Sequence, residues 1–134
     1  MITLKRKRNS GFTIIELMIV LVIVAILLAL AYPSYIDYVR KGKRGDAQQA
    51  LLNWAVNQEI WRSNHPTYAG LGDLPAPSTD YYTYDFDVDP TATVYTLQAT
   101  AQGDQANDKA RNGTSCATLT LDQSGVKSPP ECWE

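Results

Sequence analysis

Three aspartates alternate along residues 85–89, in the order Asp85, Asp87 and Asp89, and this pattern suggests carboxylate ligands for calcium. A calcium-binding loop of the EF-hand type would need glycine at Pro90 and glutamate at Thr96, so this stretch does not form one. On a β-strand the three side chains share one face. We expect that face to be solvated.

Other residue types that could do chemistry are scarce. His65 is the only histidine, it stands beside a proline, and we interpret it as an ordinary loop residue. No second histidine accompanies it as a metal ligand, and no serine, histidine and aspartate have a spacing typical of a nucleophilic site. We therefore predict that the chain is not an enzyme and that it has no cofactor and no metal.

Glu16 is the charged residue in the most unusual position. It lies near the start of a long apolar stretch, residues 12–32, which is preceded by Lys5, Arg6, Lys7 and Arg8. About 20 largely apolar residues are enough to cross a bilayer. A charged side chain at the centre of such a helix costs about 2.5–3.5 kcal/mol, and less near its end. Glu16 could extend to the membrane surface, but the position also suggests a specific role.

The small residue Gly11 stands before the apolar stretch, whereas a secretory signal peptide has its small-residue cleavage site after it. Cleavage after Gly11 would leave the apolar helix on the mature protein. The sequence Gly11-Phe12-Thr13-Ile14-Ile15-Glu16-Leu17-Met18 resembles the signature of type IV prepilins. The segment from Tyr32 to Val39 resembles the corresponding pilin segment, and the C-terminal pattern around Cys116 and Cys132 is most similar to that of PilE-type minor pilins.

The resemblance implies how the chain is processed and assembled. A prepilin peptidase would cleave between Gly11 and Phe12, and the new amino terminus on Phe12 would be N-methylated. Glu16 would then meet the Phe12 amine of a neighbouring pilin subunit. A buried ion pair is weak evidence for net stability, but it is a plausible device for setting register. The alternative to the prepilin interpretation is that the whole stretch is an ordinary single-pass anchor.

The basic residues 5–8 predict the orientation in the membrane. By the positive-inside rule the N-terminus stays cytoplasmic, and the rest of the chain lies on the periplasmic side of the inner membrane. After assembly the resemblance places it in an extracellular pilus. A second basic cluster, Arg40, Lys41, Lys43 and Arg44, follows the apolar stretch. It could meet lipid headgroups or acidic neighbours in a filament.

Residues 33–64 are predicted to continue the helix. Pro33 removes a backbone donor and clashes with the preceding turn, so we expect a kink there. From Ala47 onward the helix is amphipathic, and Trp54 and Trp61 are expected to pack in the core. Gly42 and Gly45 weaken the helix between its two halves. We expect the helix to end near Asn64, before Pro66.

The rest of the chain reads as a small β domain. Alternating patterns predict strands at residues 81–88, 94–101 and 117–121 and a short one at 126–127. The fold class is therefore α+β, a pilin-like long helix packed on an antiparallel sheet of about four strands. The predicted parts are a cleaved leader (residues 1–11), a membrane and assembly helix (12–32), its amphipathic continuation (33–64) and the β domain (65–134).

Charge and cysteine content narrow the function further. The formal net charge is −2, from 12 basic and 14 acidic residues. Loss of the four basic residues in the leader brings it to −6, which argues against general affinity for nucleic-acid phosphates. In an exported chain Cys116 and Cys132 should form a disulfide that closes a C-terminal loop.

The resemblance leaves several roles open. The first is a structural minor pilin that supports pilus assembly, twitching motility or adhesion. The second is a minor pilin that captures DNA during uptake, for which Tyr81, Tyr82 and Tyr84 could supply stacking rings. The third is a pseudopilin of type II secretion. Some pseudopilins bind calcium near their C-terminus, which leaves Asp104, Asp108 and Asp122 as weak candidate ligands.

Overall fold

The computed structural model describes residues 11–133, and its dominant element is one helix, α1 (Ile14–Arg62). The helix runs without interruption through Pro33. Its first turn carries Glu16, and its last turn carries Arg62. The chain divides into two compact units, of which the first ends at Ile36 and the second begins at Asp37. The kink expected at Pro33 stays a prediction, because continuous helical structure does not by itself define an angle.

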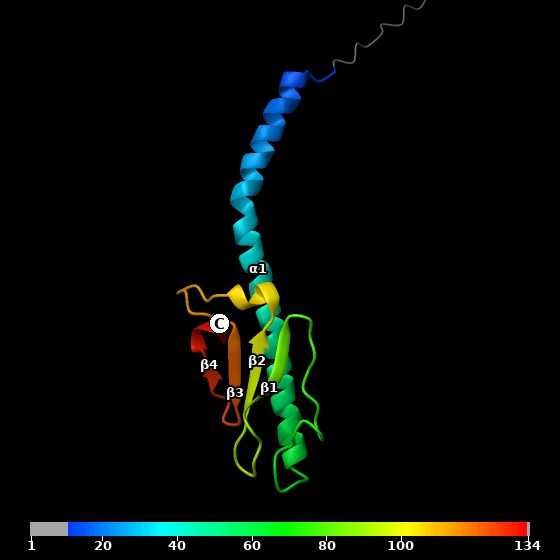
Figure 1. Cartoon of the computed structure of the whole chain (residues 1–134), viewed down its shortest axis with the longest axis vertical. Coiled ribbons are helices and arrows are strands. Elements are labelled where there is room, and N and C mark those ends of the chain that lie inside the picture. Colours follow the sequence, from blue (N-terminus) through cyan, green and yellow to red (C-terminus); the bar gives the residue numbers. More distant parts are fainter. Residues whose placement is uncertain (1–10, 134) are drawn as a thin grey trace, which may run out of the picture. The chain divides into compact units, whose positions relative to one another are not determined.

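The second unit contains a four-stranded antiparallel sheet in the order β1-β2-β3-β4. Its strands are β1 (Tyr82–Val88), β2 (Thr96–Ala101), β3 (Thr118–Asp122) and β4 (Lys127–Ser128). Each strand pairs with its neighbour in the chain, so the sheet is a simple meander (Figure 1). Two short 3₁₀ helices, η1 (Gly103–Asn107) and η2 (Pro130–Trp133), complete the unit. The predicted α+β fold and strand number are confirmed.

All four strands begin one or two residues later than the sequence predicts. Local hydrogen bonds explain the shift at β2 and β4. Val94 was expected in the second strand, but its carbonyl accepts from the Thr91 amide at 2.9 Å and its amide donates to Thr91 Oγ1 at 3.1 Å. β2 therefore begins at Thr96. The Val126 carbonyl accepts from the Asp122 amide at 3.1 Å. That bond closes the turn, so β4 begins at Lys127.

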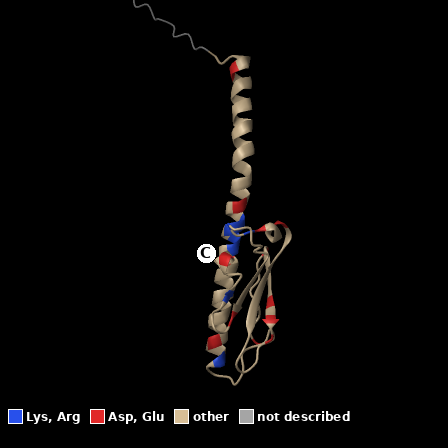
Figure 2. Ribbon diagram, turned by 90° about the vertical axis from the view of Figure 1, so that its left-hand side faces the viewer, with Lys and Arg blue, Asp and Glu red and all other residues tan. Residues whose placement is uncertain are grey.

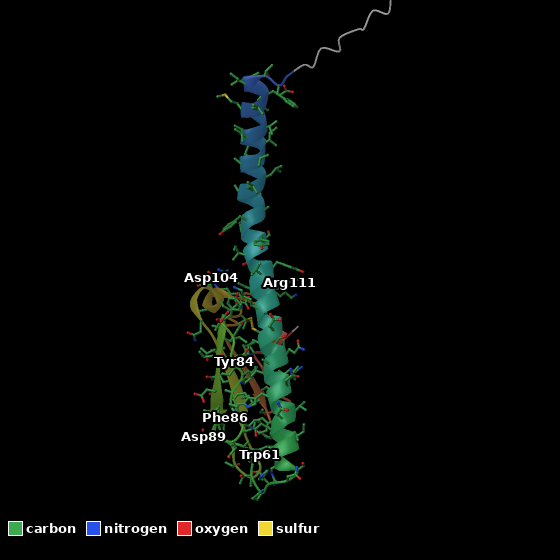
Figure 3. All side chains as sticks on the ribbon, turned by 90° about the vertical axis from the view of Figure 1, so that its right-hand side faces the viewer. Trp61, Tyr84, Phe86, Asp89, Asp104 and Arg111 are labelled. Atoms are coloured by element: carbon green, nitrogen blue, oxygen red, sulfur yellow. A yellow bond between two sulfur atoms is a disulfide. The ribbon has the colours of Figure 1, made fainter. Side chains whose placement is uncertain are left out.

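The core lies between one face of the sheet and the second half of α1. Alternate residues of each strand point inward, as the period of two requires, and the helix contributes residues at steps of three and four. Trp54 contacts Phe86 of β1, with ring centroids 4.9 Å apart. Figure 3 labels Phe86 and Tyr84 on this strand. The buried apolar side chains of helix and sheet are Ala47, Leu51, Trp54, Tyr82, Tyr84, Leu97, Ala99, Ala101, Leu119 and Leu121.

The two tryptophans of α1 have different environments. Trp54 is buried in the core, as predicted. Trp61 is only half-buried, so the prediction that it packs in the core was wrong. Its ring stacks on His65 with centroids 3.8 Å apart and planes inclined by 6° (Figure 3 labels Trp61). The helix ends at Arg62, one residue after Trp61.

Candidate assembly surface

The first half of α1 presents apolar side chains on every side. It is long and apolar enough to cross a membrane, with a mean hydropathy of 3.2 over its most apolar 18 residues, none of which is buried within the chain. Residues 17–36 carry no charge, and Figure 2 shows that half of the helix tan between its acidic ends. The exposed large apolar residues include Leu17, Ile19, Leu21, Ile23, Ile26, Leu28 and Leu30.

Glu16 is held by a local motif at the start of this helix. The Glu16 amide donates to Thr13 Oγ1 at 3.2 Å, and the Thr13 amide donates to Glu16 Oε2 at 3.4 Å. This reciprocal pair is a capping box, in which a Thr and a Glu three residues later satisfy two backbone donors of the first turn. The Thr-x-x-Glu spacing is visible in the sequence, and neither the membrane-surface nor the assembly interpretation of Glu16 uses it.

The peptide bond between Gly11 and Phe12 precedes the helix. Both residues are exposed and lie outside regular secondary structure. The remainder of the leader, residues 1–10, lies outside the described residues. The predicted cleavage site is therefore in an accessible, non-helical segment one helical turn from Glu16, a geometry that suits a processing site.

The basic cluster of α1 lies inside the second unit, and its arginines pair with carboxylates of the same unit. Arg44 Nη1 donates to Asp108 Oδ2 at 2.8 Å, and both side chains are buried. One turn earlier, Arg40 Nη2 donates to Asp104 Oδ1 at 2.8 Å and its Nε donates to Oδ2 at 3.1 Å. Neither expectation for these arginines, lipid headgroups or a filament neighbour, is needed to explain them. Of the same cluster, Lys43 places its ammonium 3.7 Å from the centroid of the Tyr81 ring.

The two carboxylates that pair with these arginines, Asp104 and Asp108, have pKa values shifted in opposite directions. Burial raises the pKa of Asp108, although Arg44 beside it acts in the opposite direction. The hydrogen bond from Arg40 lowers the pKa of Asp104, which is exposed. Burial is the larger effect only at Asp108, because that carboxylate lies inside the unit and Asp104 lies at its surface.

Two buried glutamines link α1 to the rest of the second unit, Gln58 to the loop before β1 and Gln105 to α1 and β1 together. Sequence reasoning did not assign them this role. The Gln58 side-chain amide donates to the Ala69 carbonyl at 2.9 Å and accepts from the Ala69 amide at 2.8 Å. Gln105 donates to the Arg40 carbonyl at 2.9 Å and to the Tyr82 hydroxyl at 3.1 Å. The signal for Gln58 was its place on the otherwise apolar face of α1, and the sequence around Gln105 carries no such signal.

The three weak candidate ligands for calcium in the C-terminal part of the chain are not close to one another. They are Asp104, Asp108 and Asp122. Asp104 and Asp108 pair with different arginines, and Asp122 Oδ1 accepts from the amides of Ser124 and Val126 at 2.8 Å each. Within residues 11–133 no group of three or more acidic, histidine or cysteine side chains is placed to hold a metal ion. Each of these carboxylates already has a structural partner.

Cys116 and Cys132 form a disulfide, with an S–S distance of 2.05 Å and Cα atoms 5.6 Å apart. Both residues are buried. Gln48 of α1 donates to the Cys132 carbonyl at 2.6 Å. The C-terminal segment is therefore attached through the bridge to the residues just before β3 and through a hydrogen bond to α1.

An exposed apolar helix that continues into a helix packed on an antiparallel meander defines the class of protein, and comparisons with known proteins name that class. Residues 6–32 match the prokaryotic N-terminal methylation motif. Residues 33–120 match the family described as "Type IV minor pilin ComP, DNA uptake sequence receptor". The chain therefore belongs to the type IV pilins. Within them, its second unit is similar to the ComP minor pilins.

Individual relatives support the same family. The chain is 41% identical over 79 residues to the type IV major pilin PilE1 of Neisseria gonorrhoeae, a match that spans 54% of this chain and 35% of that protein. It is 34% identical over 79 residues to prepilin peptidase-dependent protein D of Escherichia coli strain K12, spanning 56% and 54% of the two chains. The matches thus span about a third to a half of these relatives.

A solved structure shows the same fold. A type IV pilin from Shewanella oneidensis superimposes with a TM-score of 0.55 and 27% sequence identity. The match covers 71% of this chain and 98% of that one. The pilin fold predicted from the N-terminal signature is therefore confirmed over the larger part of the chain.

Proposed function

We propose that this chain is a minor pilin, a structural subunit of a type IV pilus. It is made as a membrane-anchored precursor with its N-terminus cytoplasmic, cleaved between Gly11 and Phe12 by a prepilin peptidase, and N-methylated on Phe12. It then enters the filament through residues 12–32 and supports pilus assembly, twitching motility or adhesion. The observation that carries this proposal is the apolar first half of α1, which has no partner within residues 11–133.

Burial between subunits would remove the apolar side chains of this helix from water, as a membrane does. Removing apolar surface from water is favourable by about 25 cal/mol per Å², and repeated heterologous contacts that do not close build an open filament. Glu16 accepts from the Thr13 amide through Oε2. A carboxylate offers about four lone-pair sites, so the capping box and a charged amine from a second subunit can share it.

The processing step is tested by the intact mass of the exported chain in cells with and without prepilin peptidase. We expect loss of residues 1–11 and gain of one methyl group only when the peptidase is present. An uncut chain in peptidase-competent cells would show an ordinary membrane anchor and would overturn the proposal.

Two variants separate the assembly role of Glu16 from its capping role. Glu16→Gln keeps a capping box, which accepts either Glu or Gln, but removes the charge. Thr13→Val removes the box and keeps the charge. If Glu16 pairs with an amine in the filament, Glu16→Gln is processed normally but lost from sheared pili, and Thr13→Val is retained. The reverse result would make Glu16 a helix cap only.

DNA capture is a second candidate, favoured by the description of the family that residues 33–120 match. The ion pairs occupy Arg40 and Arg44. Lys109 and Arg111 are exposed on the loop after η1 and make no ion pair within the described residues (Figure 3 labels Arg111). These two residues are a close pair of basic side chains and are our candidates for contacts with phosphates.

Titration of the detergent-solubilised mature chain with labelled duplex DNA tests this candidate. DNA capture predicts binding that weakens steeply between 50 and 200 mM salt, because phosphate contacts release counterions. The double variant Lys109→Ala/Arg111→Ala should bind several-fold more weakly than wild type. Absence of binding at 50 mM salt would reject the candidate and leave the structural role untouched.

A further inference from the structure

A hollow of about 220 Å³ lies on the second unit between α1 and the end of β3. Its walls are mostly apolar, with Leu52 and Val56 contributed by the helix and Tyr95 and Leu121 by the sheet side. Leu52 is 41% exposed and Val56 is 57% exposed, so part of this apolar surface is in contact with water. Pockets that hold drug-sized ligands measure about 300–1,000 Å³. The hollow therefore suits a smaller ligand.

Two carboxylates also line the hollow, and the chain gives neither of them a counter-charge. Glu59 and Asp122 make no ion pair within residues 11–133. Glu59 Oε1 accepts from the Tyr68 hydroxyl at 3.0 Å. Asp122 Oδ1 accepts from two backbone amides of its own turn. A carboxylate offers about four lone-pair sites, so both groups can still bind a cation.

The basic side chains nearest to these carboxylates in the sequence have other partners. Arg62, one turn after Glu59, donates to two backbone carbonyls of the neighbouring loops. Lys127, which follows the turn after Asp122, has its ammonium 5.2 Å from the centroid of the Trp133 ring. The hollow therefore keeps a negative charge that these side chains do not neutralise.

The acidity of Tyr95 reflects the same negative charge. Burial is the main reason that the pKa of the Tyr95 hydroxyl is raised, and the charges of Glu59 and Asp122 both raise it further. Both carboxylates thus act on a side chain that forms a wall of the hollow.

The composition of the hollow favours an organic cation over a metal ion. Calcium takes about six to eight oxygen ligands, and the walls here are mostly apolar. Within the described part of the chain, no group of three or more acidic, histidine or cysteine side chains is placed to hold a metal ion. A flexible alkylamine combines an apolar stem with a charged end, as a lysine side chain does. Such a molecule can cover the apolar walls and bring ammonium groups to the carboxylates.

We propose that this hollow binds a small aliphatic diamine, with its carbon chain against Leu52, Val56 and Tyr95 and its ammonium groups at Glu59 and Asp122. The two positive charges balance the two carboxylates, and the chain removes exposed apolar surface from water. An uncharged or anionic ligand would leave both carboxylates without a counter-charge as it displaced their water. The proposal goes beyond the pilus function and does not depend on it.

Titration of the detergent-solubilised mature chain with 1,5-diaminopentane, followed by NMR, tests the proposal. We expect saturable shifts at Val56, Leu121 and Gly125, and little change along the acidic residues 85–89. The matched control ligands are 1,5-pentanediol, which has the same carbon chain without charge, and methylammonium, which has the charge without the chain. Both should bind several-fold more weakly. A diol that binds as well as the diamine, or shifts that are as large along residues 85–89, would overturn the proposal.

Two variants separate binding in the hollow from general attraction to an acidic protein. Glu59→Gln removes one charge and keeps an oxygen that can accept from Tyr68. We expect it to weaken diamine binding several-fold with little change in thermal unfolding, since Glu59 is exposed. The control is Glu131→Gln, at an exposed glutamate that does not line the hollow, and it should bind like wild type. Equal losses in the two variants would show attraction to net charge and would contradict the site.

A lysine side chain of another protein carries the same alkylammonium group, so a peptide distinguishes the two sources. An acetylated, glycine-flanked lysine peptide is titrated in the same way. If the ligand is a free diamine, the peptide should bind several-fold more weakly, because it brings one ammonium group to two carboxylates. A peptide that binds as tightly as 1,5-diaminopentane would overturn the assignment to a small diamine and indicate a protein partner.

Discussion

Arg44 shows how much a single residue's role depends on its partner. In the sequence it is one of four basic residues after an apolar stretch, and nothing there distinguishes it from Lys41. In the structure it is buried and bonded to Asp108, which is 64 residues away in the chain. An isolated charge in that position would be strongly unfavourable, so removing either partner would leave the other as an uncompensated buried charge.

Replacement of Asp108 by Asn should therefore destabilise the second unit by about 3–5 kcal/mol, because it leaves the Arg44 charge buried without a counter-charge. Urea unfolding followed by tryptophan fluorescence measures this loss. Asp104→Asn is the control, since that pair lies at the surface and should matter far less. Equal losses for the two variants would show that Arg44 finds other solvation.

Because Tyr82 is buried, we predict that the free energy of unfolding depends on pH at alkaline pH. Burial raises its pKa to about 12 from the ordinary value of 10, so the folded state retains the hydroxyl proton after the unfolded chain has lost it. This contribution is complete below pH 10 and is lost as pH rises through 12. Its size is on the order of 2 kcal/mol. Tyr82→Phe should show a smaller fall in the free energy of unfolding between pH 10 and 12; an unchanged fall would assign it to other groups.

At the scale of elements, α1 has to meet different requirements along its length. Its first half is apolar on all sides, as a membrane or filament core requires. Its second half is divided between an inward face buried against the sheet and an outward face that the chain leaves open. The ion pairs of Arg40 with Asp104 and of Arg44 with Asp108 lie at the start of that second half.

Substitutions at two adjacent leucines test the division of the second half of α1 into an inward and an outward face. Leu51 is fully buried and Leu52 is exposed. We expect Leu51→Ala to lower the free energy of unfolding by about 2–5 kcal/mol, because it leaves a cavity against the sheet. Leu52→Ala should change it by less than about 0.5 kcal/mol. Chemical denaturation of the two variants compares them, and similar losses would place the helix in a different rotation on the sheet.

At the scale of the whole molecule, the second unit is closed by covalent and polar links between distant parts of the chain. The disulfide joins residues 16 apart, and the Arg44–Asp108 and Gln48–Cys132 contacts join the helix to the C-terminal third. A small unit has a limited core, so such links supply an appreciable share of its stability.

Removal of the disulfide by the double variant Cys116→Ser/Cys132→Ser should cost about 3 kcal/mol by the chain-entropy estimate for a loop of this size. Thermal unfolding in mild detergent measures it. Wild type treated with reductant under unfolding conditions should show the same loss. A double variant as stable as the oxidised chain would mean that the hydrogen bond from Gln48 and the local packing hold the segment without the bridge.

Local patterns in the sequence were sufficient for much of this protein. The apolar stretch and the alternating strands predicted the α+β class and the four-stranded sheet, because periodicity and composition act over a few neighbouring residues. The Gly11–Glu16 segment indicated the family through its resemblance to the prepilin signature. The inward face of α1 around Leu51, Trp54 and Gln58 also followed from spacing. These features need no knowledge of what the chain contacts far away.

Only the tertiary structure decided which polar residues are paired and which surfaces stay open. Arg44 bonds to Asp108, 64 residues away, and Gln105 bonds to the Arg40 carbonyl, 65 residues away. Trp61 lies half-buried and stacks on His65. Leu52, Val56 and Ile60 could be identified as exposed once the opposite face was seen to be occupied. A side chain's burial and pairing depend on all the elements around it, and local spacing contains no information about those distant neighbours.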